Sequence, residues 1–60
     1  MHLLMIVKQV LTAPKFKHNR WFVDVVAVND GIDYTTTIVC DTKLEVLEKS
    51  KLGNEIEVII

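Results

Sequence analysis

The sequence predicts a mostly β, α+β domain with the element order strand, strand, strand, helix, strand. Two apolar, β-branched runs, residues 20–28 and 32–41, are joined by a turn that contains Asp30 and Gly31. Apolar and polar side chains alternate in both runs, which is typical of strands with one buried face. The period then becomes helical at about residues 42–51, and one further alternating run ends the sequence. The 60 residues are therefore expected to form a single domain, residues 1–60.

The central hairpin is the most specific structural signal. An Asp-Gly turn between two such runs needs positive φ angles, and glycine adopts them without a steric penalty from a Cβ atom. The alternation then assigns one face of each strand to the core. The predicted inward residues are Trp21, Val23, Val25 and Ala27 in the first strand, and Ile32, Tyr34, Thr36, Ile38 and Cys40 in the second.

The flanking elements follow from shorter patterns. A first strand is expected over residues 3–12, and residues 12–19 are expected to form a loop because Pro14 cannot donate to a sheet ladder. A last strand over residues 54–60 should turn Ile56, Val58 and Ile60 inward. The early part of the first strand is apolar on both faces, which suits a central strand or one that a partner covers.

The helix carries start and stop signals. Thr42 and Glu45 have the spacing of a capping box, in which each side chain binds a free backbone N–H group of the first turn. Gly53 is expected to end the helix in the left-handed conformation. The side chains predicted to pack on the sheet are Leu44 and Leu47, with Val46 or Ser50 beside them.

This order of elements resembles a reduced OB-fold, in which a three-strand meander, a capping helix and a return strand form a small barrel. The resemblance is one of topology and covers the whole chain. An OB-fold normally has a fifth strand, and the sequence leaves no residues to form it. An SH3-like barrel, or a plain four-stranded sheet with one helix across it, also fits the pattern.

Composition restricts the class of protein. Half of the residues are hydrophobic, which excludes a disordered tail. A single cysteine excludes an internal disulfide framework, and the two histidines have no zinc-ligand spacing, so neither a metal nor another cofactor is expected. The first apolar run stops at Lys8 and is too short for a signal peptide or a membrane span. We therefore expect a cytoplasmic protein without a membrane partner.

A basic and aromatic stretch is the main candidate binding site. Cations and flat rings are what single-stranded nucleic acid binding needs, for phosphates and for base stacking. The chain carries a net charge of +4 through Val23 and −5 from Asp24 onward. Trp21 shares a face with core residues and is assigned to the interior. The candidate residues for binding a partner or a nucleic acid are Lys15, Phe16, Lys17, His18, Arg20 and Phe22.

Enzymatic activity is not expected. Cys40 continues an apolar face, where a buried thiol is the ordinary outcome, and the sequence supplies neither a base nor an oxyanion site for it. The acidic residues are dispersed or form the turn, and no phosphate-binding loop or metal motif is present. The sequence therefore predicts no catalytic residue.

Surplus apolar residues favour a protein-binding module. Leu3, Leu4, Met5 and Ile6 cannot all face one core, and Ile59 lies on the face opposite its apolar neighbours. Such a surplus indicates an exposed apolar patch, a sheet edge offered to a partner, or a homodimer seam. We expect a small regulator, adaptor or inhibitor that occupies the surface of a partner protein. Single-stranded nucleic acid binding by residues 15–22 is the alternative.

Overall fold

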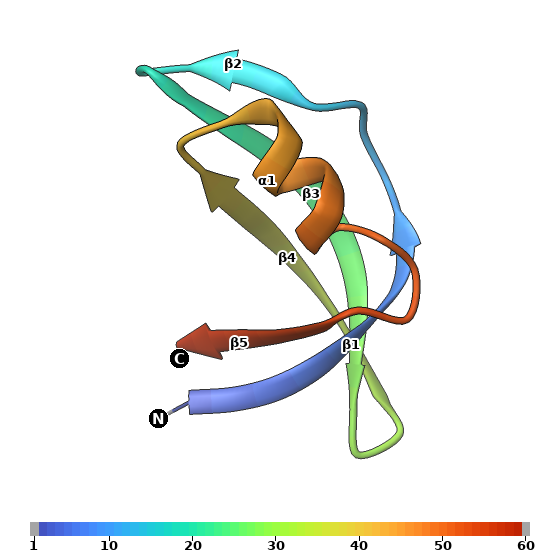
Figure 1. Cartoon of the computed structure of the whole chain (residues 1–60). Coiled ribbons are helices and arrows are strands. Elements are labelled where there is room, and N and C mark those ends of the chain that lie inside the picture. Colours follow the sequence, from blue (N-terminus) through green and yellow to red (C-terminus); the bar gives the residue numbers. More distant parts are fainter. Residues whose placement is uncertain (1, 60) are drawn as a thin grey trace.

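The computed structural model describes residues 2–59 and shows a mostly β domain with one short helix (Figure 1). The elements are β1 (His2–Val10), β2 (Lys15–Lys17), β3 (Arg20–Asn29), β4 (Ile32–Cys40), α1 (Lys43–Lys49) and β5 (Glu55–Ile59). The predicted mostly β, α+β class is confirmed. Strand β2 is an addition, because its residues were assigned to a loop. The prediction that Ile60 faces inward lies outside the described residues.

The strands form one antiparallel sheet that is not closed into a barrel. Strand β3 pairs with β4 along one edge and with β2 and then β1 along the other, and β1 pairs with β5. In Figure 1, β5 runs across the view while β3 and β4 descend from upper left to lower right, so the sheet is strongly twisted. Among the described residues no strand joins β4 to β5. The sheet is therefore not closed between them.

The core lies between the inner face of the sheet and α1. Val23, Val25 and Ala27 of β3 are buried, as the alternation predicted, and Trp21 is half-buried against the same core. In β4 the predicted inward residues nearest the helix, Ile38 and Cys40, are buried. The same prediction is wrong for Ile32, next to the turn, which is exposed because the hairpin extends beyond the core. The remaining buried side chains are Met5, Val7, Val46 and Ser50.

Two tight turns set the strand registers. Asp30 and Gly31 have φ angles of 51° and 76°, so the predicted hairpin turn is confirmed. His18 and Asn19 have φ angles of 52° and 62° and form a second two-residue turn, between β2 and β3. This turn was missed because it contains no glycine. Histidine and asparagine are among the few other residues that favour this conformation.

The helix packs on the sheet through Val46 and Ser50, which the prediction placed beside the leucines, and not through the two leucines. Val46 is fully buried and Ser50 is 4% exposed, whereas Leu44 and Leu47 are 69% and 46% exposed. The assignment of the two leucines to the core is therefore wrong. Residues four apart lie one above the other on a helix, and the short side chains at 46 and 50 allow α1 to lie close to the sheet.

The helix begins as predicted and ends earlier. The Thr42 hydroxyl accepts a hydrogen bond of 3.2 Å from the Glu45 N–H group, which is one half of the capping box. The helix ends at Lys49, and Gly53 does not cap it. Gly53 has a φ angle of 86° in the following turn, and its N–H group donates to the Val7 carbonyl at 2.9 Å. This glycine therefore starts the pairing of β5 with β1.

Replacing a core valine should destabilise the fold more than replacing an exposed one. Val25→Ala is expected to lower the free energy of unfolding by about 1–4 kcal/mol, because it leaves a cavity at a side chain with 0% exposure. Val39→Ala makes the same chemical change at a 42% exposed position and should cost less than about 1 kcal/mol. Urea titrations of both variants measure the difference. Equal costs would contradict the face assignment.

Candidate functional site

The basic and aromatic stretch forms a hairpin instead of a loop. Strand β2 pairs with the start of β3, so that Lys15 lies opposite Phe22, Phe16 opposite Trp21, and Lys17 opposite Arg20. Residues that lie opposite each other share a face, and faces alternate along a strand. The hairpin therefore separates the six candidate residues. We call the side with Lys15, Lys17, Arg20 and Phe22 the basic face.

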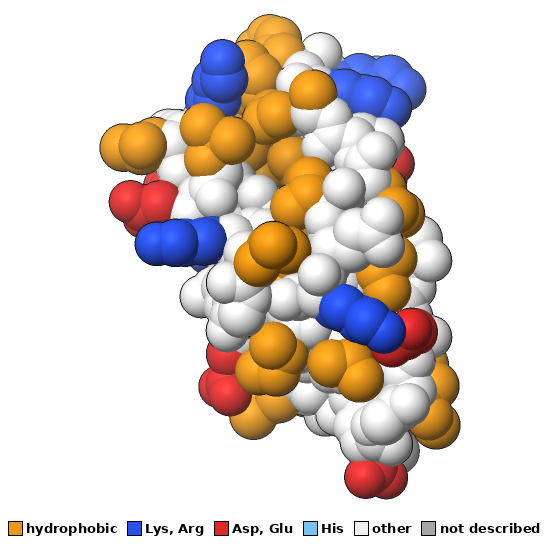
Figure 2. Space-filling view, turned by 90° about the vertical axis from the view of Figure 1, so that its right-hand side faces the viewer, with side chains coloured by type: hydrophobic (Ala, Val, Ile, Leu, Met, Phe, Trp, Pro, Cys, Tyr) orange, Lys and Arg blue, Asp and Glu red, His pale blue; other side chains and the backbone are white. Residues whose placement is uncertain are grey.

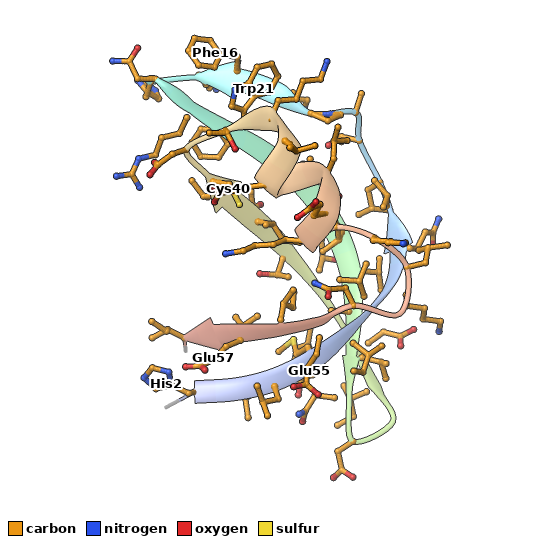
Figure 3. All side chains as sticks on the ribbon, in the orientation of Figure 1. His2, Phe16, Trp21, Cys40, Glu55 and Glu57 are labelled. Atoms are coloured by element: carbon orange, nitrogen blue, oxygen red, sulfur yellow. The ribbon has the colours of Figure 1, made fainter. Side chains whose placement is uncertain are left out.

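Phe16 lies on the other side of the hairpin, over the core. Its ring packs against Trp21 with centroids 5.2 Å apart, and the Lys43 ammonium lies 5.6 Å from the centre of the Trp21 ring (Figure 3). Trp21 is thereby covered from two elements and is half-buried against the core, so its assignment to the interior holds in part. Phe16 remains 60% exposed. The aromatic rings that the sequence grouped with the cations thus do not all lie on the same face.

The basic face surrounds a shallow hollow of about 350 Å³. Lys15, Lys17, His18 and Phe22 line it, together with Asp24 and Thr37. The Asp24 carboxylate accepts a hydrogen bond of 2.7 Å from the Thr37 hydroxyl. The hollow therefore combines two lysines and one aromatic ring with one carboxylate. A phosphate could contact the lysines, but the carboxylate weakens the local positive potential.

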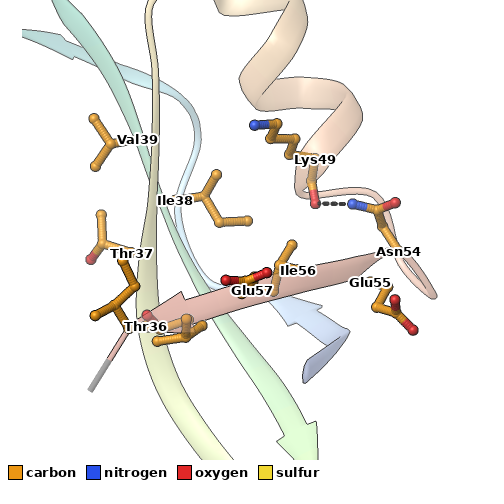
Figure 4. Close-up of a pocket in the computed structure, with 11 residues that line it drawn as sticks. Thr36, Thr37, Ile38, Val39, Lys49, Asn54, Glu55, Ile56 and Glu57 are labelled. Carbon is orange, nitrogen blue, oxygen red and sulfur yellow. Dashed lines mark hydrogen bonds between the residues drawn. The ribbon is translucent and has the colours of Figure 1, made fainter. Parts of the chain in front are cut away.

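A larger hollow of about 700 Å³ lies where the sheet is open, between β4 and β5 (Figure 4). We call it the open slot. It is lined by residues 36–39 of β4, residues 55–59 of β5, Asn54 and Lys49. Figure 4 shows Ile38 and Ile56 pointing into the space between the strands. Asn54 closes one end, where its side-chain amide donates to the Lys49 carbonyl at 2.9 Å. The slot thus has an apolar floor and two walls of backbone.

The wall formed by β4 presents free backbone groups. The Leu11 N–H group donates to the Asp24 carbonyl at 2.8 Å, so Asp24 directs its carbonyl away from β4. Because successive residues point to opposite edges, Val23 and Val25 direct theirs towards β4. The backbone groups of Ile38 and Thr36, which lie opposite these valines, are therefore directed to β3 and are not free. The N–H and C=O groups of the alternate residues, Thr35, Thr37 and Val39, face the free edge of β4, and Thr37 and Val39 lie within the stretch that lines the slot.

The wall formed by β5 presents free groups by the same reasoning. The Val7 N–H group donates to the Asn54 carbonyl at 2.9 Å, so alternate residues of β1 face β5. These are Met5 and Leu3, which lie opposite Ile56 and Val58. The free N–H and C=O groups of β5 that face the slot belong to Glu55, Glu57 and Ile59.

The sequence contained one indirect signal of the slot. The predicted OB-like topology lacked a fifth strand, and the observed sheet is not closed between β4 and β5. No side-chain motif marks it, because its binding groups are backbone N–H and C=O groups. Only the pairing of the strands shows which of these groups are free.

Charges near the slot are mainly acidic. Glu55 and Glu57 are exposed on the outer side of β5, and Lys49 is the one cation among the residues that line the slot. Glu57 also contacts the imidazole Nδ1 of His2, which is exposed (Figure 3). The lip of the slot that β5 forms is therefore negatively charged.

Surplus apolar side chains are exposed, as predicted. Met5 of β1 is buried, whereas Leu4 and Ile6 are 56% and 40% exposed, and Ile59 is 73% exposed. On the face drawn in Figure 2, apolar side chains gather towards the top of the view; lower down they form smaller groups separated by polar and charged ones. The exposed apolar area is thus distributed over several places.

Cys40 lies in the core beneath α1 and is 5% exposed (Figure 3). Burial raises the pKa of its thiol; the charge of Lys49 opposes this shift, while the carboxylates of Glu45 and Asp41 add to it. A raised pKa and low exposure make the thiol a poor nucleophile. Within residues 2–59 no three histidine, cysteine or acidic side chains are grouped to hold a metal ion.

Comparison with protein-family models, curated proteins and solved structures gives no match for this chain. Among residues 2–59 the one helix, α1, is too short to cross a membrane.

The buried thiol gives a prediction for Cys40. Ellman's reagent at pH 8 should modify it slowly in the native protein and rapidly in denaturant. Because the native state keeps the thiol proton to higher pH than the unfolded chain, the free energy of unfolding should fall as pH rises above the unfolded thiol pKa of about 8.5. The Cys40→Ala variant should lack this part of the pH dependence. Equal modification rates in both states would contradict the burial.

Proposed function

We propose that the chain is a small non-enzymatic module that binds another protein, acting as a regulator, adaptor or inhibitor. The observation that carries this proposal is the open slot, a hollow with an apolar floor that the free edges of β4 and β5 border. Free edges are the surfaces on which proteins add strands from partners.

We also propose that the fold is a reduced OB-like barrel, in preference to an SH3-like one. Four long strands occur in the spatial order β4-β3-β1-β5, and α1 connects β4 to β5. An OB-fold is a five-stranded, partly open barrel. We infer that the gap between β4 and β5 is the place of the absent strand. The proposed fold and the proposed binding surface thus share one feature, the gap between β4 and β5.

Single-stranded nucleic acid binding is the second candidate. It is favoured by the basic face, where Lys15, Lys17 and His18 gather with Phe22 around one hollow. Two observations weigh against it. Trp21 is covered by Phe16 and Lys43, and Asp24 adds a negative charge to the hollow. We therefore prefer protein binding to nucleic acid binding as the proposed function.

Affinity capture from an extract of the source organism tests the first proposal. The immobilised chain should retain a protein after nuclease treatment, since an apolar slot and backbone groups need no nucleic acid bridge. A Lys15→Ser, Lys17→Ser, Arg20→Ser variant should retain the same protein, because these cations lie on the basic face. Quantitative mass spectrometry measures the retained protein. Loss of all partners on nuclease treatment would contradict the proposal.

Fluorescence anisotropy with a labelled oligothymidine tests the second candidate. If the basic face binds phosphates, the logarithm of the affinity should fall with the logarithm of salt concentration, by about 0.7 per phosphate contacted. The triple variant should flatten this slope, and Lys51→Ser, at an exposed lysine outside the basic face, should not. We expect no saturable binding at about 0.15 M salt. Saturable binding that the triple variant abolishes would place nucleic acid binding first.

A further inference from the structure

We propose that the open slot accepts one extended segment of a partner protein, which pairs with both β4 and β5 and closes the barrel. This inference rests on the proposed protein-binding function and specifies its site and ligand. Thr37 and Val39 offer free N–H and C=O groups on one side, and Glu55, Glu57 and Ile59 offer them on the other. One inserted strand can satisfy both sets of groups.

The orientation of the inserted strand follows from the topology. Both β3 and β5 are antiparallel to β1, and β4 is antiparallel to β3. Along the order of the sheet, β4 and β5 therefore have opposite sense, and the strong twist makes the two strands cross at a steep angle (Figure 1, Figure 4). A segment between them is antiparallel to one and parallel to the other. At about 3.3 Å per residue, the lined stretches of four and six residues accommodate a strand of similar length.

A folded second copy cannot supply such a segment. Within the described residues, β1 and β3 are paired with other strands on both edges, whereas β2, β4 and β5 are each paired on one edge. The slot needs a strand with both edges free, because it has a backbone wall on each side. An extended segment of another protein meets this requirement.

The side chains of the slot define the chemistry of the segment. Ile38 and Ile56 form an apolar floor, so every second residue of the segment should be apolar and of moderate size. The intervening residues point outward beside Glu55 and Glu57. Like charges on neighbouring strands are destabilising and opposite charges are favourable, so these residues should be lysine or arginine. The ligand class is therefore a peptide of alternating apolar and basic residues.

A seven-residue peptide of alternating lysine and valine, blocked at both ends, is the probe. In the ¹⁵N-labelled protein, the amides of Thr37, Val39 and Glu57 should exchange rapidly with solvent in the free state. The peptide should slow their exchange at least about tenfold. A matched peptide of alternating glutamate and valine should bind about fivefold more weakly at low salt. Slowed exchange confined to residues outside the slot would overturn the inference.

Proline substitution identifies the wall that binds. Thr37→Pro removes an N–H group that faces the slot while leaving the hydrogen bonds to β3 intact, and it should weaken peptide binding about tenfold. Thr35→Pro places proline on the same edge outside the lined stretch, and Thr37→Val removes only the hydroxyl that bonds Asp24. Both controls should bind nearly as the parent does. Equal weakening by both proline variants would overturn the inference.

Charge reversal provides a second variant that leaves the backbone unchanged. Glu55→Lys with Glu57→Lys changes two exposed side chains and should reverse the preference, so that the glutamate and valine peptide binds more tightly. An unchanged preference would overturn the basic pattern. Slow exchange of the Thr37 amide in the peptide-free protein that depends on protein concentration would show that a second copy fills the slot, which also overturns the inference.

The inference and the proposed function fail in different ways. If a protein recovered from the extract binds the Thr37→Pro variant as tightly as the parent, the protein-binding function stands and the slot is not its site. If no protein is recovered from nuclease-treated extract, the proposed function fails whatever the peptide does.

Discussion

Strand β3 holds the molecule together because it is hydrogen-bonded to three other strands. It pairs with β4 along one edge and with β2 and β1 in succession along the other. Its inner face contributes Val23, Val25 and Ala27, which are buried completely or nearly so. A small domain buries little surface, so one strand with this number of partners accounts for much of its order. The basic face and the open slot both depend on the position of β3, directly or through β4 and β1.

Local signals predicted the parts of the fold that depend on neighbouring residues. Asp30 and Gly31 have the conformation their sequence favours, and the alternation of β3 gave the correct core face. The helix phase could not be read in this way. Val46 and Leu47 are both apolar, and only the distance between α1 and the sheet decides which one is buried. The turn at His18 and Asn19 lacked glycine and left no comparable signal.

The candidate sites likewise combine features that neighbouring residues determine with features that only the whole sheet determines. Sequence identified Lys15, Phe16 and their neighbours as chemically capable of binding, but it could not separate them into two faces. That separation depends on the register of β2 with β3, which in turn depends on the missed turn. The open slot consists of backbone groups whose availability is a property of the whole sheet. It could be anticipated only as a strand that the topology lacked.

The acidic residues on β5 bear on which partner the slot selects. Free sheet edges promote aggregation, and proteins commonly protect them with charges, proline or bulges. Neither lined stretch contains proline, and the register shift lies in β1, between Val7 and Gln9. On β5, the charges of Glu55 and Glu57 are therefore what protects the free edge from aggregation. If β5 of one copy paired with β5 of another, these carboxylates would meet like charges, which is unfavourable. A basic segment meets the opposite charge, so the same two side chains disfavour self-association and favour a partner of the proposed kind.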